Sequence, residues 1–205
     1  MREVDVPASR VERWVANFAD RHGGVELSAE GGELRGSAPD GSRFTARPPL
    51  GQEYAGPPAA DAFAAAVRPL DDWGVLLVRK GGFAVARMAG DGMAAHKVGR
   101  RHVQGRTKAG GQSQQRFARR RGNQAREAYR AAADHAAEIL GAGRLLVVTG
   151  GDRAAVEEVL ADARLARVAV VPPWMAVPDP RRAVLDDVVA RAVSARFTVH
   201  DTQID

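Results

Sequence analysis

The sequence contains no cysteine. Disulfide bonds and thiolate metal sites are therefore excluded, and the absence fits a reducing compartment. No stretch approaches the ~18 apolar residues of a membrane helix, and the first six residues, Met-Arg-Glu-Val-Asp-Val, hold no apolar run of the kind found in a signal peptide. We therefore expect a cytoplasmic protein with no membrane partner.

Signatures of bound metals and nucleotides are also missing. The five histidines show no ligand spacing, such as two histidines four residues apart on one helix. Gly150 and Gly151 follow an apolar stretch, but neither a Walker lysine nor a full dinucleotide fingerprint accompanies them, so we interpret residues 149–152 as a tight turn. No Ser-His-Asp set is recognisable. The sequence predicts no metal, no nucleotide and no other cofactor.

Acidic residues are nearly absent from one segment. Between His96 and Arg130 there are eleven Lys and Arg and a single acid, Glu127, which gives this segment a net charge of +10. The other 19 basic and 24 acidic residues leave the rest of the chain at −5. A solvated helix face is the alternative interpretation, but such faces usually alternate in sign. The concentration indicates a polyanion-binding surface on a mildly acidic body.

The remaining composition is that of a globular protein, with 45% hydrophobic and 27% charged residues. Apolar residues at helical spacing predict a helix over residues 6–21, which Gly23 and Gly24 end. Short alternating pieces over residues 25–48 predict a meander of hairpins. Residues 50–58 are rich in Gly and Pro and form the expected linker, and a short helix is expected over residues 59–67. We expect a domain boundary near residue 55, after a small N-terminal α+β appendage.

The second half of the chain predicts an α/β layer architecture. Two apolar runs joined by Lys80-Gly81-Gly82 predict a hairpin with glycines at positive φ, and a third strand is expected over residues 93–98. After an exposed loop at residues 102–111, residues 113–140 keep helical spacing and form the longest predicted helix. Strands at 145–148, 168–171 and 197–199 alternate with helices at 153–162 and 179–196.

Residues 107–119 match a known family. They read Thr-Lys-Ala-Gly-Gly-Gln-Ser-Gln-Gln-Arg-Phe-Ala-Arg, which closely resembles the middle domain of archaeal and eukaryotic class I peptide chain release factors. In that domain a Gly-Gly-Gln loop, the GGQ motif, is followed by Ser, by Arg-Phe and by a long basic helix. The resemblance extends less tightly over residues 73–199 and leaves residues 1–55 uncovered. It implies a mixed sheet with helices on both faces, RNase H-like, in a catalytic domain over residues 56–205 with the GGQ loop at 103–113.

The resemblance assigns the chemistry to the glutamine of this loop. In the family the loop enters the peptidyl transferase centre, and the glutamine helps to place water on the ester that joins peptide to tRNA. A neutral amide offers donors and an acceptor without the cost of burying a charge. Glycines allow close backbone approach to RNA. We therefore expect Gln112, Gly110 and Gly111 to be catalytic, with Gln114 as the competitor of Gln112, because some relatives carry a Gly-Ser-Gln version of the motif.

The basic residues around the loop are the candidate RNA contacts, where each phosphate contact adds sequence-independent affinity. The expected set on both sides of the loop is Lys97, Arg100, Arg101, Arg106, Lys108, Arg116, Arg119, Arg120, Arg126 and Arg130. Phe117 and Tyr129 fit the apolar stripe of the helix, so we expect them in the core rather than stacked on bases.

A chain of 205 residues leaves no room for a stop-codon decoding domain and a GTPase-binding region beside this domain. What remains resembles the Vms-like release factors (VLRF), actinobacterial type. That resemblance implies a codon-independent peptidyl-tRNA hydrolase that acts on stalled ribosomes or large subunits in ribosome quality control. Its partners would be the large ribosomal subunit, peptidyl-tRNA and rRNA. Two alternatives remain open: a non-catalytic ribosome- or tRNA-binding rescue factor, and a nuclease that cleaves the tRNA 3′ end.

Overall fold

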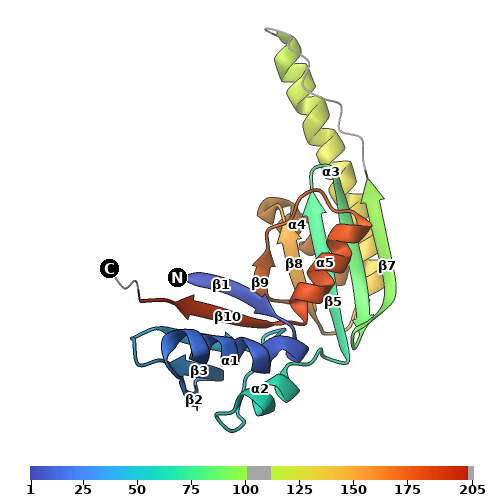
Figure 1. Ribbon diagram of the computed structural model, residues 1–205. Coiled ribbons are helices and arrows are strands. Elements are labelled where there is room, and N and C mark those ends of the chain that lie inside the picture. Colours follow the sequence, from blue (N-terminus) through green and yellow to red (C-terminus); the bar gives the residue numbers. More distant parts are fainter. Residues whose placement is uncertain (101–111, 203–205) are drawn as a thin grey trace. The chain divides into compact units, whose positions relative to one another are not determined.

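A computed structural model describes residues 1–100 and 112–202, and for residue 100 and residues 112–125 it describes the backbone alone. The chain forms two compact units (Figure 1). The first consists of Met1–Leu70 and Val189–Asp205, and the second of Asp71–Val188.

The first unit is an antiparallel five-stranded sheet with helices. Its elements are β1 (Arg2–Val6), η1 (Ala8–Arg10), α1 (Val11–His22), β2 (Glu26–Glu30), β3 (Glu33–Ser37), β4 (Arg43–Arg47), α2 (Ala60–Ala66) and β10 (Ala195–His200). The strand order is β1-β10-β4-β3-β2. The last strand of the chain therefore lies between the first strand and β4.

Aromatic side chains form the core of this unit. Phe197 of β10 is fully buried, and its ring centroid lies 4.2 Å from that of Trp14 and 5.4 Å from that of Phe44. Helix α1 packs Val15 and Phe18 into the same core. The unit is thus completed by residues from the far end of the chain.

Several predictions for these residues are confirmed. The helix ends at Gly23, whose φ of +77° is open to glycine, and the predicted hairpin meander is β2–β4. The helix begins at Val11 rather than at residue 6, because residues 2–6 form strand β1, which was not predicted although Val4 and Val6 alternate with Glu3 and Asp5. The strand expected at residues 197–199 exists, but it pairs with β1 and β4 rather than with the strands of the second unit.

The compact units also differ from the expected boundary near residue 55. Residues 56–70 include α2, whose Phe63 is fully buried in the core of the first unit. Residues 189–205 return to the same unit through β10. The two units are defined by packing alone. The domain boundary near residue 55 therefore stays a prediction.

The second unit is built on a mixed sheet. Its elements are β5 (Asp72–Arg79), β6 (Gly82–Ala89), β7 (Gly92–Arg100), α3 (Gln112–Leu140), β8 (Leu145–Gly151), α4 (Arg153–Leu160), η2 (Ala163–Leu165), β9 (Val168–Met175) and α5 (Arg182–Ala192), which ends in the first unit. The strand order is β7-β6-β5-β8-β9. Strands β5, β6 and β7 pair antiparallel, whereas β8 pairs parallel with β5 and β9.

Helices cover both faces of this sheet, as the resemblance implied. Figure 1 shows α3 and α4 on one face and α5 on the other. Residues of β5 alternate between the two faces, so that Leu76 and Val78 pack under α3 and α4. Leu185 of α5 is fully buried. The expected α/β fold class is confirmed.

The predicted hairpins β5–β6 and β6–β7 are also confirmed. One detail is wrong: neither Gly81 nor Gly82 has a φ in the positive region. Helix α5 is shorter than the predicted helix over residues 179–196, because β10 begins at Ala195.

Candidate functional site

Helix α3 is held on the sheet by its C-terminal half. Tyr129, Ala132, Ala136 and Leu140 recur at helical spacing and are buried against β5 and β6. Among the described side chains of α3, three of the five buried ones are alanines, Ala132, Ala133 and Ala136, which lets the helix lie close to the strands. The interpretation of Tyr129 as a core residue is confirmed.

The C-terminal end of α3 is capped by a charged pair. Arg87 of β6 donates to both carboxylate oxygens of Asp72, at 2.9 and 2.7 Å, and its Nη1 donates to the carbonyl of Leu140 at 3.3 Å. The hydrogen bond from Arg87 lowers the pKa of Asp72 below its usual value. A cation at a helix C-terminus is favoured by the helix dipole. The pair therefore ties the end of α3 to β5 and β6.

A second charged group connects α3 to η2. Arg164 in η2 donates to Asp134 of α3 at 2.6 Å and to Asp162 at 2.7 Å. Hydrogen bonds from the side chain and backbone of Arg164 lower the pKa of Asp162 to about 2. Exposed ion pairs of this kind contribute little stability singly. Their effect here is to restrict the orientation of the helix.

The N-terminal half of α3 extends beyond the ends of the strands (Figure 1). The helix has 29 residues, from Gln112 to Leu140, which corresponds to a length of ~43 Å at 1.5 Å per residue. Gln112 is its first residue. The anchored half thus forms a fixed base for a helix whose far end starts at the predicted catalytic glutamine.

The predicted site residues lie on β7, on α3 and outside the described residues. Lys97 on β7 and Arg126 and Arg130 on α3 are exposed. Lys97 pairs in register with Val85, which packs under α3, so Lys97 lies on the same face of the sheet as that helix. Arg100 ends β7, and Gln114, Arg116, Arg119 and Arg120 lie on α3, with the backbone alone described. Gly110, Gly111, Arg101, Arg106 and Lys108 lie outside the described residues.

The basic excess belongs to the unit that carries α3. The second unit holds 20 of the 30 Lys and Arg but 13 of the 25 Asp and Glu, a net charge of +7 against −2 for the first unit. A polyanion is therefore attracted to the second unit.

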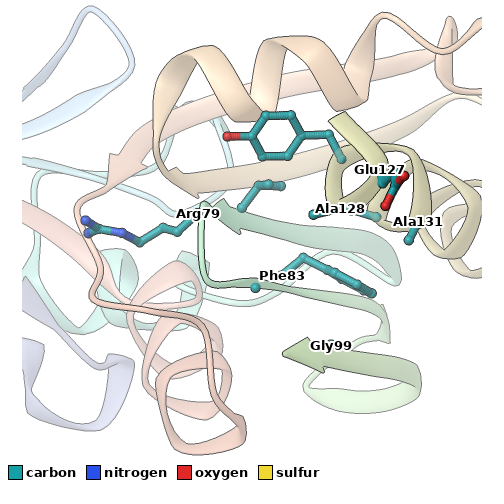
Figure 2. Close-up of a pocket in the computed structure, with 10 residues that line it drawn as sticks. Arg79, Phe83, Gly99, Glu127, Ala128 and Ala131 are labelled. Atoms are coloured by element: carbon teal, nitrogen blue, oxygen red, sulfur yellow. The ribbon is translucent and has the colours of Figure 1, made fainter. Parts of the chain in front are cut away.

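A cavity lies between α3 and the ends of the strands, and the sequence did not indicate it. It has a volume of about 410 Å³ and is lined by Val78, Arg79, Gly82, Phe83, Gly99 and residues 127–129, 131 and 132 of α3. Figure 2 shows Glu127, Ala128 and Ala131 on the helix opposite Phe83 and Gly99. Burial, with the charges of Asp152 and Glu158, raises the pKa of Tyr129 in its wall. Its lining comes from α3 and from the strands β5, β6 and β7, and such a combination has no local sequence signal.

The interpretation of residues 149–152 as a tight turn is wrong: residues 149–151 are the last residues of β8, where they pair with β5, and Asp152 joins this strand to α4. Asp152 caps α4 by accepting from the backbone N–H of Ala155 at 3.4 Å. A Cβ on Gly151 would lie 2.3 Å from the carbonyl oxygen of Val78, and its φ is +105°, so glycine is required there. Gly151 is thus explained by its close approach to β5.

The described residues, in 1–100 and 112–202, contain no group of three or more His, Asp or Glu side chains placed to hold a metal ion. No helix within these ranges is long and apolar enough to cross a membrane.

The mixed sheet and the long helix of the basic segment form an α/β unit consistent with a release-factor-like domain. A model of the family described as "Actinobacteria/chloroflexi VLRF1 release factor" matches residues 71–198. This match spans more than half of the chain, and the chain therefore belongs to the VLRF1 release factor family. It begins where the second unit begins and runs through most of β10. No curated protein sequence matches the chain significantly. Membership of a release factor family implies interaction with the ribosome.

Proposed function

We propose that this protein is a cytoplasmic, codon-independent peptidyl-tRNA hydrolase that releases nascent chains from stalled ribosomes or large subunits in ribosome quality control. The observation that carries the proposal is the position of Gln112. It follows Gly110-Gly111 in the sequence and is the first residue of a long helix whose other end is anchored on the sheet.

The geometry suits a reaction in which the ribosome supplies an activated ester. Hydrolysis then requires a positioned water and a donor for the developing oxyanion rather than a nucleophile from the protein. Gln112 supplies the amide in this proposal, and Gly110 and Gly111 let the backbone pass close to ribose and base. Gln114 is its competitor two residues into the helix.

The proposed partners are rRNA of the large subunit and peptidyl-tRNA. Lys97, Arg126 and Arg130 are exposed near the base of α3, and phosphate contacts from such residues give affinity without sequence preference. In the proposal the remaining basic residues follow the RNA toward the loop. They are Arg100, Arg101, Arg106, Lys108, Arg116, Arg119 and Arg120.

The chemical outcome separates this function from its alternatives. Large subunits that carry peptidyl-tRNA, without mRNA or small subunit, are incubated with the protein, and the tRNA 3′ ends are sequenced. Ester hydrolysis leaves an intact terminal CCA and free peptide. A missing CCA would assign the protein to tRNA 3′-end cleavage, and binding without either product would make it a non-catalytic rescue factor.

A further inference from the structure

Five of the ten residues that line the cavity beside α3 are alanine or glycine. They are alanines at positions 128, 131 and 132 of the helix and glycines at positions 82 and 99 of the strands, with the Phe83 ring packed against Gly99. A leucine at any of these helix positions would occupy part of the space. Its volume of about 410 Å³ falls within the range of roughly 300–1,000 Å³ of sites for small organic groups. Most of the lining is apolar, as in such sites.

Glu127 is the charged residue of α3 that lines this cavity. It is also the single acid among the eleven basic residues of the segment from His96 to Arg130. A carboxylate is unfavourable on a surface that meets phosphates, because like charges repel. It is favourable where it accepts hydrogen bonds from an amine. A carboxylate has about four acceptor positions, so a bond to another protein group does not exhaust it.

The surroundings of the cavity favour RNA as the source of that amine. Lys97 lies two residues before Gly99 on β7 and on the face of the sheet that carries α3, and Arg126 and Arg130 lie on the same turns of the helix as the lining residues. Cations can hold the phosphates on either side of one nucleotide while its base enters an apolar space. Guanine presents two adjacent N–H donors, N1 and N2, on its Watson–Crick edge. Both oxygens of one carboxylate can accept from them together.

We propose that this cavity binds one unpaired guanine base of the RNA that contacts α3. The Glu127 carboxylate accepts hydrogen bonds from the N1–H and the N2 amino group of that base. The inference rests on the proposed function only in that RNA is the partner. It adds a base-specific contact to a surface otherwise bound through phosphates.

The test measures binding of the full chain to five-nucleotide RNAs AAXAA, with X being G, A, C or U, by fluorescence anisotropy at fixed salt. A good bidentate contact discriminates by ~1–3 kcal/mol, or roughly 5- to 150-fold, so the guanine RNA is expected to bind at least fivefold more tightly than the others. Glu127→Gln replaces two acceptors by one acceptor and one donor, so the side chain can no longer accept from both N–H groups of guanine. This variant is expected to lose the preference for guanine.

Two further variants separate this contact from general electrostatics. Ala128→Leu fills the cavity and is expected to remove the base preference while the slope of affinity against salt is retained. Glu138→Gln also removes one acid from α3 but lies outside the cavity, and its base preference should equal that of the wild type. Circular dichroism verifies that each variant is folded.

Equal binding of the four RNAs by the wild type would overturn the proposal. So would an equal gain in affinity for all four RNAs in Glu127→Gln, because loss of repulsion alone would then explain it. Gln112→Ala keeps the base preference if the cavity acts as proposed, whatever its effect on peptide release. A failure of the hydrolase proposal is therefore distinguishable from a failure of this one.

Discussion

Replacing Ala136 by leucine tests whether the packing of the C-terminal half of α3 on the sheet determines the position of Gln112 at its other end. Ala136 is fully buried between α3 and the sheet, so three added carbon atoms must push the helix away from the strands. Overpacking of this kind costs ~1–3 kcal/mol. We expect the second unit to lose stability by that amount and to remain folded.

The effect on function is larger because the helix acts as a lever. Gln112 lies 24 residues from Ala136, or ~36 Å along the helix axis, so a tilt of about 5° at the base moves the far end by ~3 Å. A displacement of ~1 Å at a reacting centre can cost ~100-fold in rate. Ala136→Leu is therefore expected to lower the rate of peptide release at least 100-fold.

The assay is single-turnover release of labelled peptide from large subunits at saturating protein, with sedimentation to measure binding. Binding should be retained, because the exposed arginines are unchanged. Glu138→Leu is the matched control, since it adds a leucine to the same helix at an exposed position, and it should release at the wild-type rate. Wild-type release by Ala136→Leu, with the expected loss of stability, would refute the lever argument.

Three further predictions concern stability and binding. Phe197→Ala should lower the free energy of unfolding of the first unit by ~3–5 kcal/mol. In urea titrations of protein labelled with 5-fluorotryptophan, the ¹⁹F signal of Trp14 should then change at a lower urea concentration, while the signals of Trp73 and Trp174 keep their midpoints. A common shift of all three signals would contradict the two-unit description. The pKa of Asp162 is lowered from 3.8 to about 2, so its contribution is present above pH 3.8 and lost as the pH falls toward 2; Arg164→Gln should flatten this part of the stability profile of the second unit in urea titrations, and an unchanged profile would exclude it. Arg126→Gln and Arg130→Gln should each lower the slope of log K against log salt for ribosome binding by about 1, and an unchanged slope would remove that residue from the RNA contacts.

Local patterns in the sequence predicted most elements of the fold. The spacing of Val11, Val15 and Phe18 predicted α1, and Lys80-Gly81-Gly82 marked the β5–β6 hairpin. Both signals arise from residues that are neighbours along the chain. The long helix α3 was predicted for the same reason, since its apolar stripe from Phe117 to Leu140 repeats over about six turns.

Local sequence patterns do not specify which strands pair when those strands are far apart in the chain. Residues 195–200 show a strand pattern, but nothing in them specifies β1 and β4 as partners rather than β9. The choice depends on the burial of Phe197 beside Trp14 and Phe44, which come from other parts of the chain. The division of the chain into two compact units follows from that pairing, and no local pattern indicates it.

The candidate site was predicted in part for similar reasons. The Gly-Gly-Gln sequence and the basic segment are continuous in the chain and could be recognised there. The anchoring of α3 by Arg87 and Arg164, and the cavity between Ala128 and Gly99, join residues that are far apart in sequence. Single alanines and glycines carry no signal of a cavity until the elements are packed.

The rate of peptide release by Gln112→Ala, measured against Gln114→Ala, is the most direct test of the central claim. Purified large subunits loaded with peptidyl-tRNA are mixed with saturating amounts of each variant, and binding is measured in parallel. Removal of one donor to a developing oxyanion typically lowers the rate ~10²- to 10³-fold, so Gln112→Ala should release slowly while binding normally, and Gln114→Ala should stay close to the wild type. Unchanged release by Gln112→Ala with binding retained would contradict the assignment of catalysis to this glutamine.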